Sequence, residues 1–213
     1  MARIYFYKLT TDNGGAPHVN GGLLSLAICK PMIRSTAKRG DLIFGFAANA
    51  LYEDNRLIYA AQVTEKLDGG DYYSAAYASR GDCIYERHND HFVRRDGALY
   101  HEGPAHLVHD LGDPPYPRAN VLLSNIFSYF GKNGSADYKD RHRAIKHAVE
   151  GLTQGHRVEH ATGLRGELQK LAAEVLTTRA RVLGAPTSAP DRGVCFRDEE
   201  VHVVDEDCVR THC

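Results

Sequence analysis

The sequence predicts an α+β fold in which a mostly antiparallel, small β-barrel is followed by C-terminal helices. Short runs rich in β-branched and aromatic residues occupy most of the first 130 positions and are separated by Gly, Pro and Asn clusters. From residue 145 onward, the apolar residues follow a helical period. Hydrophobic residues make up 43% and charged residues 25% of the 213 positions, which excludes collagen-like, coiled-coil and wholly disordered chains.

The first 64 residues indicate several short strands joined by turns. Strands are expected at 3–9, 42–46 and 57–64. The run 23–29 fits either a strand or a short helix, because periodicity alone does not separate the two. Pro31 suits the first turn of a helix, so one or two helical turns are expected at 32–38.

The middle of the chain is rich in loops. A short helix is expected at 71–78, where Asp71 is a suitable N-cap. Short strands are expected at 83–85, 91–93 and 106–108. The longest apolar run, 120–130, is expected to form one strand.

Helical periodicity and charge divide the rest of the chain. Apolar residues at helical spacing predict one helix over 145–152 and a longer one over 164–183. We therefore expect a barrel domain at 1–160, a C-terminal helix packed on it at 161–185, and an acidic tail at 186–213. From residue 191 the tail carries seven acidic residues against three basic ones, and it adds a strand at 201–204 or stays loosely ordered.

Several function classes are disfavoured by composition. No run approaches the roughly 20 apolar residues of a membrane helix, and the N-terminus is too short and too polar for a signal peptide, so a cytoplasmic location is expected. The five cysteines contain no CxxC, so neither a disulfide framework nor a zinc ribbon is indicated. The net charge is −1, so a polyanionic partner would have to meet a local patch.

The best-defined charged feature is a basic cluster around the predicted helix at 32–38. Its members are Lys30, Arg34, Lys38 and Arg39. One interpretation is a phosphate or nucleic-acid handle, in which Arg acts as a fork and Lys as a point charge. The alternative is a solvated face with local ion pairs.

Tyrosine is unusually frequent, with twelve residues in a chain that has no Trp. Tyr72, Tyr73, Tyr77 and Tyr85 lie close together in sequence. Tyrosines around a small barrel can sandwich a flipped base, and such stacking contributes about 1–3 kcal/mol per base. Ordinary core packing explains the same spacing.

Other polar residues are weaker candidates. Asp41 follows Gly40 in a tight turn, where a carboxylate usually accepts bonds from nearby backbone amides. Ser124 interrupts an apolar run and needs a partner in the backbone, in water or in a ligand. His156 and Arg157 lie in a break between helices, from which they could reach a site.

The sequence indicates neither a metal nor a cofactor. The spacing of His101, His106 and His109 does not match the HExxH pattern of zinc enzymes. GxSxG, P-loop and GxGxxG motifs do not occur.

Several motifs together resemble the nucleotide modification associated domain family of the second type. The most specific are the Cys29-Lys30-Pro31-Met32-Ile33-Arg34 block, Gly40-Asp41, Gly81-Asp82-Cys83-Ile84-Tyr85 and Phe127-Ser128-Tyr129-Phe130-Gly131. The resemblance covers residues 3–160 and implies a link to DNA base hypermodification in phages and bacteria. The Gly-Asp-strand pattern is also similar to the barrels of the PUA, EVE and YTH-like group, which bind RNA or modified bases. The Trp cage of the YTH readers has no counterpart here, so any cage would consist of Tyr and Phe.

Three functional hypotheses follow. The first is a module that binds DNA or a modified nucleotide through a basic and aromatic cleft, which would contain Lys30, Arg34, Tyr59, Tyr72, Tyr73, Ser124 and Arg157. The second is an enzyme of nucleotide or DNA base modification, with Asp41 or His156 as general base. The third is a protein-interaction module, in which the helix at 164–183 and the acidic tail mediate assembly, including a homo-oligomer.

Overall fold

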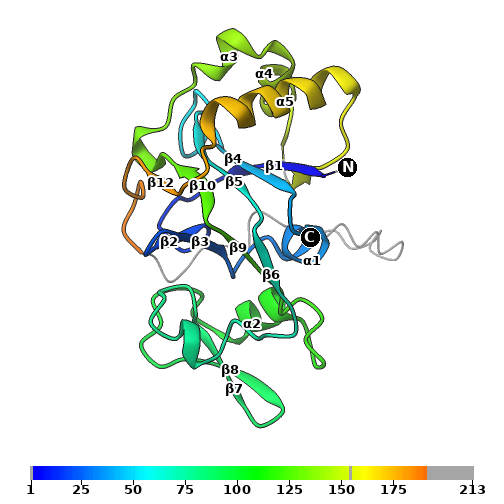
Figure 1. Ribbon diagram of the computed structural model, residues 1–213. Coiled ribbons are helices and arrows are strands. Elements are labelled where there is room, and N and C mark those ends of the chain that lie inside the picture. Colours follow the sequence, from blue (N-terminus) through cyan, green and yellow to red (C-terminus); the bar gives the residue numbers. More distant parts are fainter. Residues whose placement is uncertain (1, 154, 191–213) are drawn as a thin grey trace, which may run out of the picture.

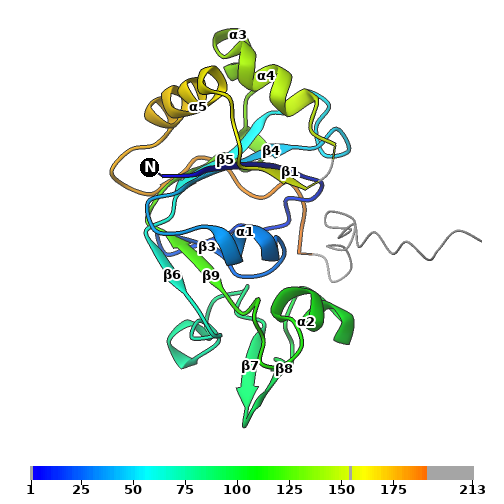
Figure 2. The same ribbon diagram turned by 90° about the vertical axis from the view of Figure 1, so that its right-hand side faces the viewer.

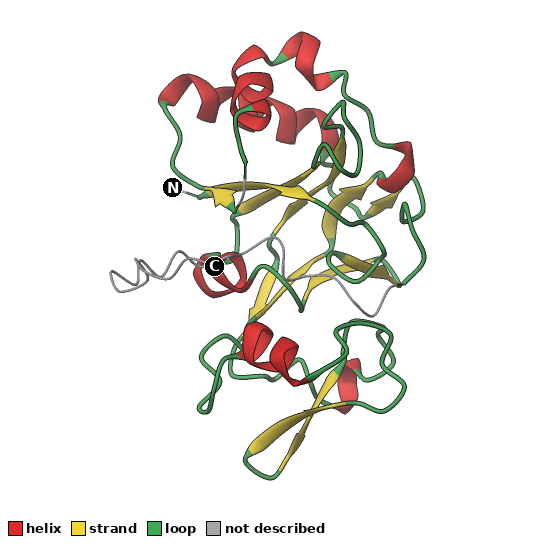
Figure 3. Cartoon of the chain, turned by 180° about the vertical axis from the view of Figure 1, so that it is seen from behind, coloured by secondary structure: helices red, strands yellow, loops and turns green. Residues whose placement is uncertain are grey.

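The structure is a computed structural model that describes residues 2–153 and 155–190, and it contains helices and several sheets (Figures 1 and 3). The described strands are β1 (Ile4–Leu9), β2 (His18–Asn20), β3 (Leu23–Leu26), β4 (Leu42–Ala47), β5 (Leu57–Gln62), β6 (Glu65–Leu67), β7 (Tyr85–His88), β8 (His91–Arg94), β9 (Val121–Ser124), β10 (Ile126–Tyr129), β11 (His156–Arg157) and β12 (Arg181–Val182). The described helices are α1 (Pro31–Thr36), α2 (Pro104–Leu111), α3 (Tyr138–Arg141), α4 (Arg143–Glu150) and α5 (Thr162–Val175), with 3-10 turns η1 (Ala75–Tyr77) and η2 (Gly131–Asn133).

The strands form two main sheets and a hairpin. The larger sheet has the order β11-β1-β4-β5-β10-β12, in which β1 is parallel to β4 and β10 is parallel to β12. The smaller sheet, β2-β3-β9-β6, is antiparallel throughout, and β7 pairs with β8. The described strands therefore form open sheets. The predicted α+β composition and mostly antiparallel pairing are confirmed, whereas a closed barrel is not found among the described residues.

The larger sheet is covered on both faces, as Figure 2 shows. Side chains alternate along a strand, so Phe6 of β1 packs on the side of α4 and α5, while Tyr7 points to the opposite side, into a second core shared with β3 and β9. Strands that are buried on both faces read as continuous apolar runs. This accounts for the unbroken hydrophobic character of Ile4–Leu9.

A third core lies on the far side of the smaller sheet. It contains Tyr72, Tyr73, Tyr85 and Phe92, and it connects the β7–β8 hairpin and α2 to the rest of the molecule (Figure 1). No helix in the described ranges is long and apolar enough to cross a membrane.

Several expected elements differ from those observed. Residues 106–108 belong to helix α2, because Pro104 opens a helical turn and His106 and Asp110 share its buried face. The helix expected over 164–183 ends at Val175, and Arg181–Val182 instead pairs with β10. The helix expected over 71–78 is reduced to the 3-10 turn η1.

The run expected to be a single strand at 120–130 is divided between the two main sheets. Ser124 lies at the crossing, where its Oγ is 2.7 Å from the Gln62 carbonyl oxygen and 2.9 Å from that of Ile126. Because the backbone satisfies this hydroxyl, the chain can pass from one sheet to the other at a buried position. The predicted strand at 201–204 and most of the predicted acidic tail lie outside the described residues.

Candidate active site

The candidate site begins at the junction between β3 and α1. Cys29 has φ 56° and Lys30 has φ 44°, a left-handed conformation that non-glycine residues rarely adopt. The Cys29 carbonyl oxygen accepts a hydrogen bond from Arg34 Nε at 2.6 Å, and its N–H donates to Asp110 Oδ1 at 2.8 Å. The turn is thus held from both sides, which is how backbone strain persists at functional sites.

His101 lies between Cys29 and Asp110. Its Nε2 is 3.3 Å from Cys29 Sγ, and its Nδ1 is 2.5 Å from Asp110 Oδ2. His101 also has a positive φ, 53°. Three of the six non-glycine residues with positive φ in the described ranges therefore belong to this one site. The Cys–His–Asp order and spacing are those of a nucleophile, a general base and an orienting carboxylate.

Asp110 is completely buried and accepts hydrogen bonds from several groups. Besides the Cys29 amide and His101, the Tyr85 hydroxyl donates to Oδ2 at 2.7 Å, and the Arg34 guanidinium lies 3.7 Å from Oδ1. Burial alone would raise the pKa of Asp110, but His101, Arg34 and Tyr85 together outweigh it and lower this pKa below its ordinary value. Asp110 is therefore ionised at neutral pH. An ionised carboxylate fixes a proton on His101 Nδ1 and leaves Nε2 facing the sulfur.

A second histidine borders the imidazole. The rings of His106 and His101 stack with their centroids 4.6 Å apart. Burial lowers the pKa of His106, and the neighbouring His101 lowers it further. The stacked ring is therefore neutral at pH 7 and limits the rotation of His101.

The two described cysteines differ in state and surroundings. Cys83 is a free thiol, buried in the third core, and burial raises its pKa. Cys29 is disulfide-bonded in this structure. The thiol that nucleophilic chemistry requires at Cys29 is therefore formed on reduction. This disulfide differs from the expectation from the cysteine pattern, in which no disulfide is indicated.

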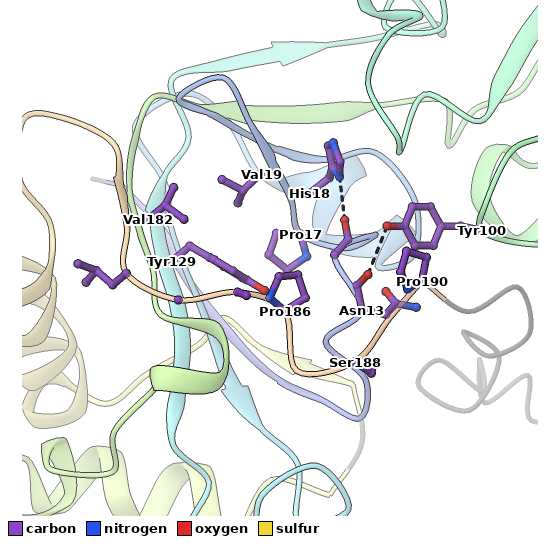
Figure 4. A pocket seen from close by; sticks show the side chains of 14 residues that line it. Asn13, Pro17, His18, Val19, Tyr100, Tyr129, Val182, Pro186, Ser188 and Pro190 are labelled. Atoms are coloured by element: carbon purple, nitrogen blue, oxygen red, sulfur yellow. Dashed lines mark hydrogen bonds between the residues drawn. The ribbon is translucent and has the colours of Figure 1, made fainter.

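A cavity of about 750 Å³ is lined in part by Tyr100, the residue before His101 (Figure 4). Its walls come from the loop before β2, from Tyr129 and from the segment 182–190. The Tyr100 hydroxyl donates to the Asn13 carbonyl oxygen at 3.3 Å, and His18 Nδ1 is 2.8 Å from the Gly14 carbonyl oxygen. Cavities of this size accommodate nucleoside-sized molecules.

Arg34, expected as half of a phosphate handle, points into the interior. Its side chain is completely buried, and its nitrogens donate to the backbone oxygens of Cys29, Asp110, Arg118 and Asn120 at 2.6–2.9 Å. Arginine presents a rigid fork of five N–H donors, and here that fork joins α1, α2 and the loop before β9. Lys30 precedes helix α1 as its N-cap residue, and its Nζ lies 5.0 Å from the centroid of the Tyr7 ring.

The tyrosines expected to stack on a base are core residues. The Tyr59 hydroxyl lies 2.9 Å from that of Tyr7, and Tyr73 donates to the Ala27 carbonyl oxygen at 2.7 Å. Tyr72 donates to Asp82 at 2.6 Å and receives a bond from Arg80 at 2.9 Å. All three expected stacking rings are at most 3% exposed, so the structure does not arrange them with Lys30 and Arg34 in an open cleft.

The remaining predicted residues occupy separate places. Asp41 accepts hydrogen bonds from the amides of Arg3 and Lys38, at 2.7 and 2.9 Å, as a turn carboxylate does. Arg157 is exposed on edge strand β11. His156, on the same strand, pairs with Tyr7, and its pKa is lowered by burial and by the charge of Lys30.

Cys29, His101 and Asp110 are not among the catalytic residues predicted from the sequence. His101 belongs there to a group of histidines without a metal-site spacing, and Cys29 belongs to a family motif. The three residues are spread over 82 positions of the chain, and no local pattern links them. The available signal was a cysteine at a predicted strand-to-helix junction, together with a histidine and an aspartate elsewhere in the chain.

A comparison with protein-family models matches residues 1–189 to the nucleotide modification associated domain 2. No significant match was found among curated proteins or among solved structures. The matched range includes Cys29, His101 and Asp110. Because the match extends over far more than half of the 213 residues, the chain belongs to the nucleotide modification associated domain 2 family.

Proposed function

We propose that this protein is a cysteine-dependent enzyme of nucleotide modification. The observation that carries the proposal is the continuous line from Cys29 Sγ through the His101 imidazole to the buried Asp110 carboxylate. The family gives the context of nucleotide modification, and the geometry favours catalysis over simple binding. A binding module has no need for a strained cysteine aligned with a histidine and an ionised carboxylate.

The proposed reaction is covalent addition of Cys29 to an electrophilic carbon. His101 Nε2 removes the proton from the reduced thiol, and the sulfur forms a bond to a carbonyl or amidine carbon of the substrate. The electron pair of the C=O or C=N bond moves to its oxygen or nitrogen, then returns as the leaving group departs with the proton from His101. Water hydrolyses the resulting acyl or imidoyl intermediate and restores the thiol.

Asp110 and Lys30 have supporting roles in this proposal. Asp110 stabilises the imidazolium that forms when His101 takes the proton, because its charge is fixed before the reaction begins. Lys30 directly follows the nucleophile in the chain and is one of the nucleotide-binding residues predicted from the sequence. We therefore assign its ammonium group to a phosphate of the substrate. The cavity beside Tyr100 is large enough to receive the base or sugar.

The substrate is proposed to be DNA or a modified nucleotide. Nucleobases and the groups attached to them contain the carbonyl and amidine carbons that a thiolate attacks. The binding function expected from the sequence is thus retained as substrate binding, but through the surroundings of Cys29 rather than through Arg34, Tyr72 and Tyr73.

The test is a trapping experiment on reduced protein. The full chain is treated with dithiothreitol, a dithiol that releases the Cys29 thiol by disulfide exchange, and the dithiothreitol is removed. In separate reactions, the protein is then incubated with plain and modified nucleotides or with iodoacetamide. Peptide mass spectrometry is expected to show rapid alkylation at Cys29 and a nucleotide adduct on the same residue. Cys83→Ala retains both signals, and Cys29→Ala lacks them. Slow alkylation of Cys29, at the rate of the buried Cys83, would overturn the proposal.

A further inference from the structure

A basic surface lies on α3 and α4, at the opposite end of the molecule from α2 (Figure 1). Residues 139–147 contain four Lys or Arg residues and one acidic residue, Asp140, whereas the whole chain has a net charge of −1. A depression of about 410 Å³ is lined by Asp140 together with four basic or titratable residues. We call these four the α3–α4 basic cluster: Lys139, Arg143, Lys146 and His147.

Helix α5 fixes the position of the two helices that carry this cluster. His142, between α3 and α4, is buried, with its Nε2 3.0 Å from Glu174 of α5. Glu167 of α5 accepts the amides of Ala144 and Ile145 at 2.8 and 3.2 Å, which satisfies the start of α4. Because Ile145 is buried beneath α4, the charged side chains at positions 143, 146 and 147 lie on the outer side of the helix.

The cluster keeps a net positive charge, because its three Lys and Arg residues outnumber the two nearby carboxylates, Asp140 and Glu150. Lys139 forms an ion pair with Glu150 at 2.9 Å. Arg143 and Lys146 form no ion pair or side-chain hydrogen bond with any other described residue at the distances that define such contacts. Lys8 of β1 is close enough to interact with this group, because burial and the charge of Lys139 both lower the pKa of Lys8, while Glu150 raises it. Cations that are only partly compensated by carboxylates indicate an anionic partner.

We propose that the α3–α4 basic cluster binds the phosphate backbone of a nucleic-acid polymer. The lining contains no Phe, Tyr or Trp and no aliphatic residue, and the imidazole of His147 is its single ring. An aromatic face would be needed to stack a base, and apolar side chains would be needed to enter a membrane surface. Contacts limited to charges position a nucleic-acid backbone without reading its sequence. This inference rests on the proposed function for the context of nucleotide modification.

The experiment measures binding of a fluorescent 20-nucleotide duplex and of the matching single strand by anisotropy at several salt concentrations. Arg143→Ala with Lys146→Ala is expected to weaken binding and to make the slope of log K against log salt concentration shallower by about 1 for each cation removed. Arg143→Lys with Lys146→Arg keeps the charges and is expected to retain the affinity. Arg179→Ala with Lys132→Ala removes one exposed arginine and one exposed lysine elsewhere and is the matched control.

Each outcome bears on the proposal. If the cluster variant and the control variant lost the same amount of oligonucleotide affinity, the net charge of the protein alone would explain the effect, and the proposal would be overturned. Binding of anionic lipid vesicles or of an acidic peptide, without binding of the oligonucleotides, would also overturn it. Alkylation of Cys29 is read out separately. Rapid alkylation of Cys29 without oligonucleotide binding would therefore reject the nucleic-acid surface but support the proposed chemistry. Oligonucleotide binding with slow alkylation of Cys29 would support the nucleic-acid surface but reject the proposed chemistry.

Discussion

The guanidinium of Arg34 and the carboxylate of Asp110 lie 3.7 Å apart, and both side chains are completely buried. Arg34 also donates to four backbone oxygens, one of which is that of Asp110. A charged pair removed from water is tolerated only where hydrogen bonds satisfy both groups. This pair joins the helix that follows the candidate nucleophile to the helix that carries the orienting carboxylate, so the core and the site depend on each other.

Removal of the arginine is expected to destabilise the protein strongly. In Arg34→Ala, Asp110 stays buried without the guanidinium that compensates its charge, and several buried carbonyl groups lose their hydrogen-bond donor. We expect the free energy of unfolding to fall by about 3–5 kcal/mol. Urea denaturation measures the change. Arg39→Ala, at an exposed position of the same basic segment, is the control and is expected to stay within about 0.5 kcal/mol of the parent. A phosphate-binding role without a structural one would give little change in stability at either position.

The reactivity of Cys29 is expected to depend on His101. A thiol paired with an imidazolium ionises below the ordinary thiol pKa of about 8.5, so the alkylation rate of the reduced protein should rise with an inflection below that pH. His101→Gln is expected to move this inflection upward and to slow alkylation at pH 6.5 by at least about tenfold. His88→Gln, on the exposed β7–β8 hairpin, controls for loss of a histidine. Superimposable pH profiles for the parent and His101→Gln would contradict the assigned base.

The stability of the protein is expected to depend on the protonation of Asp12. This buried residue accepts the Tyr129 hydroxyl at 2.6 Å and the Thr187 amide and hydroxyl at 3.2 Å each, and thereby holds the segment that forms one wall of the large cavity. Burial raises the pKa of Asp12, although these hydrogen bonds partly oppose the rise. The folded state therefore binds a proton at a higher pH than the unfolded chain does.

The sign of this effect follows from linkage. Where the folded state binds more protons, the free energy of unfolding falls as pH rises. Relative to Asp12→Asn, which does not titrate, the parent should therefore gain stability as pH decreases through the raised pKa toward the ordinary value of 3.8. Urea denaturation of both proteins at several pH values measures the difference. A difference that is constant with pH, or that shrinks on acidification, would contradict the prediction.

Two glycines are expected to respond in opposite directions to alanine. A Cβ at Gly45 of β4 would lie 2.3 Å from the Tyr59 ring and 2.6 Å from Leu9, so Gly45→Ala should cost about 1–3 kcal/mol through overpacking. A Cβ at Gly166 of α5 meets no atom within 4 Å, so Gly166→Ala should stabilise the helix by up to about 1 kcal/mol. Thermal and urea unfolding of both variants test the pair. Tolerance of alanine at position 45 would show that the Tyr59 ring can move aside.

Local sequence determined much of the architecture. Alternating or continuous apolar runs mark β1, β4 and β5, and Pro31 opens α1 where it was expected. The family motifs correctly indicated membership. These features depend on neighbouring residues in the chain, since backbone preference and side-chain period act over a few positions.

Tertiary structure decided what the charged and aromatic residues do. Arg34 and the tyrosines 59, 72 and 73 have side chains suited to a nucleotide-binding site, as predicted from the sequence. In the folded protein all four are buried, and buried partners satisfy their polar groups. Conversely, Cys29, His101 and Asp110 have little in common until α2 packs beside the turn after β3 and brings sulfur, imidazole and carboxylate into contact. A side chain's role depends on its solvation and on its distance from groups that are far away in the chain, and only the folded arrangement of helices and sheets sets both.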